Sequence, residues 1–149
     1  MGLSAILLGC NKSAVQPLTA AQAISGSYTA ATYQSFGISK AYPINGQTIQ
    51  IQISPVAADS VMVKVFSTVN GFYSPGTAST YPSVFVKTLN CISCQFSQFY
   101  SVCLSAPIDP GTLENTIVLQ PAYDNKASYY YIPPNYDKGA VETILTRIN

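Results

Sequence analysis

Three cysteines in the second half of the sequence have a spacing that is typical of redox or metal chemistry. Cys91 and Cys94 form a Cys-x-x-Cys motif, and Cys103 follows Cys94 by nine positions. A redox pair needs a helix N-terminus to lower a thiol pKa, but the residues around this motif favour strands. A zinc site needs four ligands, and the group offers no fourth Cys and no His. We therefore interpret these cysteines as structural and predict neither a metal nor a cofactor.

The same three cysteines allow three disulfide pairings in an oxidising compartment. A bond from Cys91 or Cys94 to Cys103 would staple a hairpin, whereas a bond from Cys91 to Cys94 would close a tight and strained loop. We predict that Cys94 pairs with Cys103, with Cys91–Cys103 as the alternative. One thiol is then left over.

Few residues of the chain are able to do acid–base chemistry. The sequence contains no His, which excludes Ser-His-Asp and Cys-His mechanisms. Its six carboxylates are well separated, with no spacing that suggests a catalytic pair. The net charge is +1 and the seven basic residues never cluster, so the chain has no electrostatic footprint for nucleic acid. We predict that the protein is not an enzyme and does not bind nucleic acid.

The N-terminal residues resemble a secretion signal. An apolar run ends in Leu7-Leu8-Gly9-Cys10 and is followed at once by polar residues, which resembles the lipobox of bacterial lipoproteins. The resemblance implies that residues 1–9 are a signal-peptide remnant, that Cys10 is lipidated and that residues 10–25 form a tether. The positively charged start of such signals is missing, so we expect the true start to lie upstream. Asn11 in place of Asp favours the outer membrane of the cell envelope.

From residue 26 onward the hydrophobic pattern has the period of two that is typical of strands. The clearest alternation is in residues 47–53, and Pro55 with Asp59 marks the expected turn after it. Asn45-Gly46 is the strongest hairpin signal. The predicted strands cover residues 28–33, 47–53, 61–66, 84–87, 96–104, 116–119, 129–132 and 141–148. About eight short strands and almost no helix predict an all-β fold, either an antiparallel up-and-down barrel or, as the alternative, a β-sandwich.

Two ends of this predicted domain resemble the lipocalins. In that family a Gly-x-Trp motif on the first strand packs beneath an Arg from the end of the barrel; here the corresponding residues are Gly26-Ser27-Tyr28 and Arg147. Residues 18–149 also resemble small lipocalin-like lipoproteins of Gram-negative bacteria, through this start, the hairpin sequence YPINGQTI and the terminal Arg. The resemblance implies a lipocalin-like barrel over residues 26–149, closed at one end by Tyr28 and Arg147. It implies no particular activity, because such barrels have many functions.

A barrel of this size either holds one small ligand or is filled by its own side chains. The sequence leaves both functions open. The first is binding of a small apolar ligand in a cavity whose lining would include Ile49, Ile51, Ile53, Val63 and Val65. The alternative is a structural or protein-interaction module of the envelope without a ligand, for which loops 71–82 and 105–114 would form the contact surface. In either case the predicted partner is a membrane, through the lipid anchor.

The tyrosines form a further pattern. Tyr129, Tyr130 and Tyr131 are consecutive, so in a strand Tyr130 would point to the face opposite its neighbours. The first interpretation is that Tyr is a good strand residue. The second is that one face of these strands presents aromatic rings to an apolar ligand or to sugar rings.

Overall fold

The computed structural model describes residues 17–44, 46, 48–67, 78–90, 98–104, 116–119, 126–131 and 141–148. Within these residues the chain forms one short helix and nine strands. Their bounds are α1 Ala20–Ile24, β1 Gly26–Ser35, β2 Ile38–Ala41, β3 Ile49–Ala57, β4 Ser60–Ser67, β5 Ala78–Asn90, β6 Gln98–Cys103, β7 Thr116–Leu119, β8 Lys126–Tyr131 and β9 Val141–Arg147.

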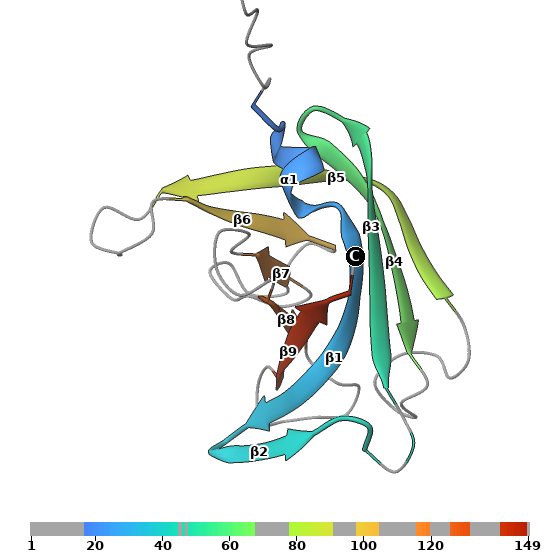
Figure 1. Cartoon of the computed structure of the whole chain (residues 1–149), viewed down its shortest axis with the longest axis vertical. Helices are drawn as coiled ribbons and strands as arrows, with labels where there is room; N and C mark the ends of the chain where they lie inside the picture. The colour runs from blue at the N-terminus through green and yellow to red at the C-terminus, as the bar shows by residue number, and fades with distance from the viewer. Residues whose placement is uncertain are drawn as a thin grey trace, which may run out of the picture.

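The strands form a closed antiparallel barrel (Figure 1). Each strand from β3 to β8 pairs with the next in the chain, β3 pairs with the first half of β1, and β9 pairs with the other edge of β1. Eight strands therefore make the ring, while β2 folds back on the second half of β1. The predicted up-and-down, lipocalin-like barrel is confirmed, and the alternative of a β-sandwich is wrong.

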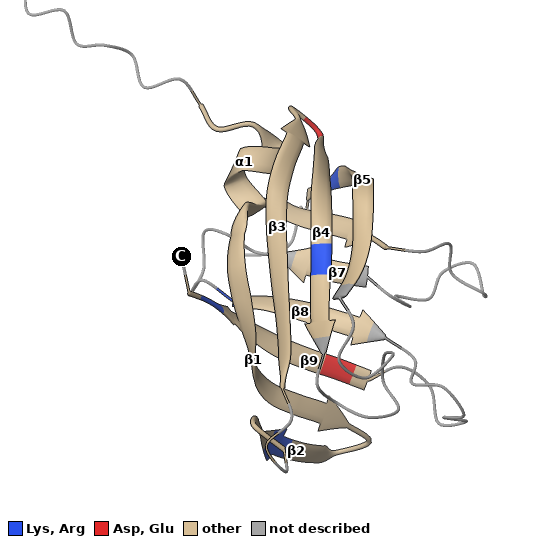
Figure 2. Cartoon of the chain, turned by 90° about the vertical axis from the view of Figure 1, so that its right-hand side faces the viewer, with Lys and Arg blue, Asp and Glu red and all other residues tan. Residues whose placement is uncertain are grey.

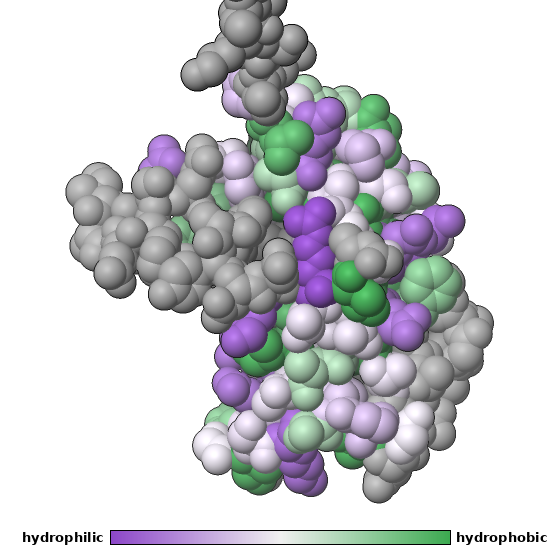
Figure 3. Space-filling view, viewed as in Figure 1, coloured by the Kyte–Doolittle hydropathy of each residue, from purple (hydrophilic) through white to green (hydrophobic). Residues whose placement is uncertain are grey.

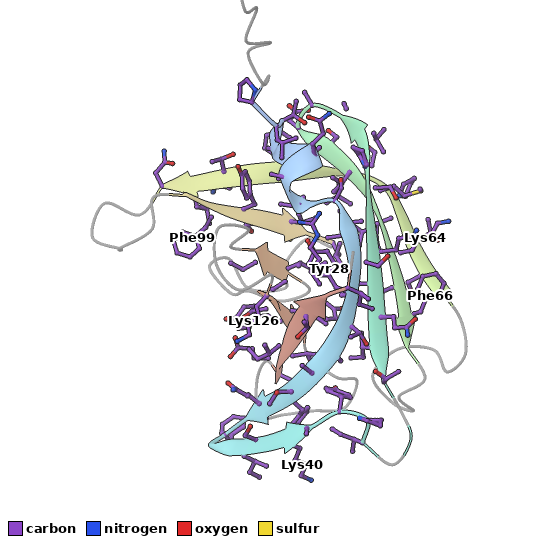
Figure 4. The ribbon with its side chains drawn as sticks, in the orientation of Figure 1. Tyr28, Lys40, Lys64, Phe66, Phe99 and Lys126 are labelled. Atoms are coloured by element: carbon purple, nitrogen blue, oxygen red, sulfur yellow. The ribbon has the colours of Figure 1, made fainter. Side chains whose placement is uncertain are left out.

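Alternating side chains explain why these segments pair around one core. In β3, Ile49, Ile51 and Ile53 are buried, whereas Gln50 and Gln52 between them are exposed. The partner strand β4 has the same alternation, with its Val residues inside and with Lys64 and Phe66 projecting from the outer face (Figure 4). Burial of one face by the period-two pattern fixes the register, because a slip by one residue would turn the apolar set outward.

Two prolines lie inside strands, and for Pro55 this corrects the expected turn. β3 continues through Pro55 to Ala57, and the β3–β4 turn lies at Ala58 and Asp59. β5 begins at Ala78 and passes through Pro82. On β5 the register against β4 shifts between Tyr81 and Val84, so Pro82 lies in the bulge and its missing N–H costs no bond to β4. On β3, Pro55 is still paired with Val61 of β4, and the register shifts just after it, before Ala57.

The helix α1 belongs to the folded domain and is not tether. Thr19 forms a capping box, with Gln22 N–H donating to Thr19 Oγ1 at 3.2 Å and Thr19 N–H donating to Gln22 Oε1 at 3.0 Å. The side chains of Ala21 and Ile24 are fully buried in the core. The N–H of Ala21 also donates to the carbonyl of Ala58 in the β3–β4 turn. The folded unit therefore starts before residue 26, where the sequence placed its boundary.

Charges are sparse on the barrel and do not gather (Figure 2). Asp59 lies at the β3–β4 turn and Glu142 on β9, far apart along the barrel. The face seen in Figure 3 alternates hydrophobic and hydrophilic residues in its described part, without one broad apolar area. None of the described helical residues forms a segment of the length and hydropathy that would cross a membrane.

Candidate functional site

One end of the barrel is closed by α1, Tyr28 and Arg147, and we call it the capped end. Tyr28 and Arg147 are directly opposite each other on β1 and β9. The guanidinium carbon of Arg147 lies 6.0 Å from the centre of the Tyr28 ring, within the range of a cation–π contact. Tyr28 is almost fully buried and points into the barrel (Figure 4). The structure thus brings together the two residues that the resemblance to lipocalins predicted.

These two side chains also donate hydrogen bonds to the backbone carbonyl groups at the C-terminus of α1. A helix end leaves backbone carbonyls without partners, and here Tyr28 Oη donates to the carbonyl of Ile24 at 2.7 Å. Arg147 Nη1 donates to the carbonyl of Ala23 at 3.5 Å, and Nη2 donates to that of Ser25. Burial raises the pKa of Tyr28, and the nearby Arg147 charge partly offsets this shift. The capped end is therefore a structural element whose polar groups are paired with one another.

The residues that the sequence predicts to line a ligand cavity all belong to the buried core. Ile49, Ile51, Ile53, Val63 and Val65 have exposed fractions of 0–2%. They stabilise the barrel by burying apolar surface. That they line a ligand cavity stays a prediction.

A polar position interrupts this apolar interior. Thr143 on β9 is fully buried between Tyr33 of β1 and Tyr129 of β8, its cross-strand neighbours. Its hydroxyl has no hydrogen-bond partner among the residues that the structure describes. Such a hydroxyl costs about 1–3 kcal/mol. Because Thr143 has no exposed surface, the position offers no room for a ligand.

The cysteine predictions fall largely outside the described residues, which include Cys103 but not Cys10, Cys91 or Cys94. Cys103 is exposed at the end of β6, and Gln98, the first residue of that strand, lies five residues or about 17 Å away along it. A disulfide joins Cα atoms about 4.4–6.8 Å apart, so a partner of Cys103 would have to lie much closer to it than Gln98 does. The predicted pairing with Cys94 or Cys91 remains a prediction. No three metal-ligating side chains come together within the described ranges.

The opposite end of the barrel carries a groove of about 620 Å³ beside the β1–β2 turn. We call it the hairpin groove. It is lined by Gln34, Ser35, Phe36, Gly37, Ile38, Ser39, Tyr130 and Glu142. This volume lies within the range of small-molecule sites, which is about 300–1,000 Å³. A second hollow, on the outer face of β1, β3 and β4, measures about 210 Å³ and is below that range.

Three neighbouring strands supply the polar wall of the hairpin groove. Glu142 on β9 is directly opposite Gln34 on β1 and Tyr130 on β8, so the three side chains form one row on the outer face. Tyr130 Oη donates a hydrogen bond of 2.9 Å to Glu142 Oε1. Burial raises the pKa of Tyr130, and the hydrogen bond to Glu142 and its negative charge raise it further. Tyr130 is therefore a neutral donor that holds the carboxylate in place.

The apolar wall comes from the hairpin itself. Phe36 is 67% exposed and Ile38 is 55% exposed, so neither side chain is needed by the core. Phe36 has a φ of 48° and Gly37 a φ of 76°. The left-handed region suits Gly and Asn and is unfavourable for a bulky residue, yet a Phe occupies the first of the two turn positions. Strained residues are concentrated at functional sites, and this one presents its ring to solvent beside a groove.

No family model, curated protein or solved structure matches this chain.

Sequence reasoning found the capped end and missed the hairpin groove. The prediction that Tyr130 points away from Tyr129 is confirmed, because Tyr129 is fully buried and Tyr130 lies on the outer face. The available signal for the groove was the dipeptide Phe36-Gly37, because hairpin turns with two left-handed residues prefer Asn or Asp before Gly. Of the predicted contact loops, residues 71–77 and 105–114 lie outside the described residues, and 78–82 belong to β5.

Proposed function

We propose that this protein is a lipid-anchored component of the bacterial cell envelope whose barrel binds a small ligand with an apolar surface in the hairpin groove. The observation that carries the proposal is the exposed, strained Phe36 at the edge of a groove of ligand size. A Phe in the left-handed region costs stability through its conformation, and its exposed ring gains little from burial in return. The strained backbone beside a groove distinguishes Phe36 from the other exposed apolar residues and supports contact with a ligand there.

The rest of the barrel supports a binding role at this end. The capped end is filled by α1, and the described interior next to it is packed. The groove combines apolar surface from Phe36 and Ile38 with the polar row of Gln34, Tyr130 and Glu142. A mostly apolar pocket with a few convergent polar groups is the usual form of a small-molecule site.

The ligand proposal is tested with the neutral apolar dye N-phenyl-naphthylamine, whose fluorescence rises on binding. We expect the purified full chain to bind the dye, and Phe36→Ala to weaken binding about tenfold or more. Phe85→Ala is the matched control, because Phe85 is also highly exposed but does not line the groove. Loss of binding in both variants, or in neither, would contradict the groove as the site.

The anchor is tested separately in a Gram-negative host supplied with an alkyne-tagged fatty acid. We expect label on the wild-type chain in the membrane fraction and none on Cys10→Ala, because the thiol is the acylation site that the resemblance implies. A wild-type protein that carries no label would overturn the anchor and leave the groove proposal standing.

The second candidate function is a structural or protein-interaction module without a small ligand. The complete burial of the inward side chains of β3 and β4 favours it, because a barrel filled by its own residues needs no ligand. Absence of dye binding by the wild-type chain, together with cross-links to another envelope protein in intact cells, would support this candidate over the first.

A further inference from the structure

We infer that the hairpin groove selects organic cations, namely small ammonium compounds with an apolar body, and that Glu142 is the residue that recognises their charge. This inference rests on the proposed function and names the ligand class of the same site. It starts from a carboxylate that the groove presents without a cationic partner.

Glu142 is half-buried on β9, and its hydrogen-bonded contact within the described residues is the neutral phenol of Tyr130. No described Lys or Arg forms an ion pair with it: Lys40 on β2 is exposed, and Arg147 lies five residues further along β9 with its guanidinium on α1. A carboxylate without a counter-charge attracts a cation, and the attraction is screened less at a half-buried side chain than at a fully exposed one.

The hydrogen bond from Tyr130 also sets which part of the carboxylate is available. Tyr130 Oη donates its hydrogen bond to Glu142 Oε1. An ionised carboxylate has two oxygens, and each can accept hydrogen bonds. Glu142 Oε2 is therefore open to a donor or a cation from the groove. Gln34, directly opposite on β1, adds an amide that can accept a hydrogen bond from an ammonium or hydroxyl group.

Aromatic rings supply the remaining chemistry. The exposed ring of Phe36 and the ring of Tyr130 line the same groove as Glu142. The face of an aromatic ring attracts a cation, and quaternary ammonium groups are recognised by such rings in combination with apolar contact. A carboxylate beside two aromatic side chains thus discriminates an ammonium compound from a neutral molecule of the same shape.

The experiment compares choline with dimethylbutanol, its neutral isostere in which carbon replaces the ammonium nitrogen. Amide chemical shifts of the full-length chain are followed by NMR during titration at low ionic strength. We expect choline to bind about tenfold more tightly than dimethylbutanol, and the shifts to centre on the groove. Glu142→Gln, which keeps an oxygen for the Tyr130 hydrogen bond, should lower choline affinity and leave only the part of the preference over dimethylbutanol that the aromatic rings supply.

Two controls keep the result specific. Asp59→Asn removes the other described carboxylate, which lies at the β3–β4 turn, and should leave the preference for choline unchanged. For the wild-type chain, added salt should weaken choline binding and leave dimethylbutanol binding unaffected, because screening acts on charge.

Each outcome decides a separate question. Equal affinity of the wild-type chain for the two probes, or a preference for choline that is as large in Glu142→Gln as in the wild-type chain, would overturn the inferred recognition of the charge by Glu142. Choline binding away from the groove, or no binding of either probe, would also overturn it. The dye experiment with Phe36→Ala then reports independently whether the proposed function survives.

Discussion

The two ends of the barrel are built on opposite principles. At the capped end, the helix termini and the side chains of Tyr28 and Arg147 pair their polar groups with one another, and apolar residues are buried. At the hairpin end, Phe36 and Ile38 are exposed, a turn residue is strained, and Glu142 has no basic partner among the described residues. One end therefore serves stability, and under the proposed function the other end gives up stability for binding.

The largest effect is expected from Arg147→Met at the capped end. The substitution keeps an aliphatic stem but removes the donors for the carbonyls of Ala23 and Ser25 and the charge over Tyr28. We expect a loss of about 2–3 kcal/mol in the free energy of unfolding, measured in urea, because hydrogen bonds that involve a charged donor are worth more than neutral ones. Lys64→Met on the outer face is the control and should change stability by less than about 0.5 kcal/mol. Equal losses in the two variants would contradict a special role for the capped end.

A smaller effect is expected from Tyr28→Phe, which removes the hydrogen bond to the carbonyl of Ile24 and costs about 1 kcal/mol. Burial raises the pKa of Tyr28 above its ordinary value of 10.0, so the folded chain keeps the phenol proton to higher pH than the unfolded chain. This contribution to stability is present below pH 10 and is lost as pH rises above 10.

Unfolding free energies measured across this alkaline range therefore separate the two proteins. The free energy of unfolding of Tyr28→Phe should fall less steeply with pH than that of the wild-type chain. Some dependence should remain, because burial also raises the pKa values of Tyr81 and Tyr130. Identical alkaline slopes for the two proteins would show that Tyr28 does not titrate differently on folding.

The smallest effect, and one of opposite sign, is expected at the hairpin end. Phe36→Asn places a residue that accepts the left-handed region at a φ of 48° and removes exposed apolar surface. We expect the variant to be more stable than wild type by about 0.5–1 kcal/mol and to bind the apolar dye more weakly. Phe85→Asn, at an exposed strand position with ordinary backbone, should gain no stability. A destabilised Phe36→Asn would mean that the ring supports the fold.

Those parts of the structure that depend on strand periodicity could be predicted from the sequence. Alternation in residues 49–53 and 61–65 identified the inward faces correctly, because the side-chain period of a strand is a local property. The contact of Tyr28 with Arg147 was predictable from a resemblance, although the two residues are far apart in the chain.

Features that depend on neighbours were not predictable in this way. Pro82 lies within a strand because a register shift against β4 accommodates it, and that shift is a property of the pair of strands. Thr19 and Gln22 do form a readable capping box, but the burial of α1 against the β3–β4 turn is a tertiary contact. The row of Gln34, Tyr130 and Glu142 needs the closure of β1 on β9, which brings together residues distant in sequence.

The packing of α1 has a consequence for how the molecule would stand on a bilayer. With Cys10 as the proposed anchor, Ala20, the first residue of α1, lies ten positions after the acylated residue. Even a fully extended chain of that length reaches at most about 35 Å. The capped end would therefore stay close to the lipid headgroups, and the hairpin groove, at the far end of the barrel, would face the aqueous compartment where solutes diffuse past it.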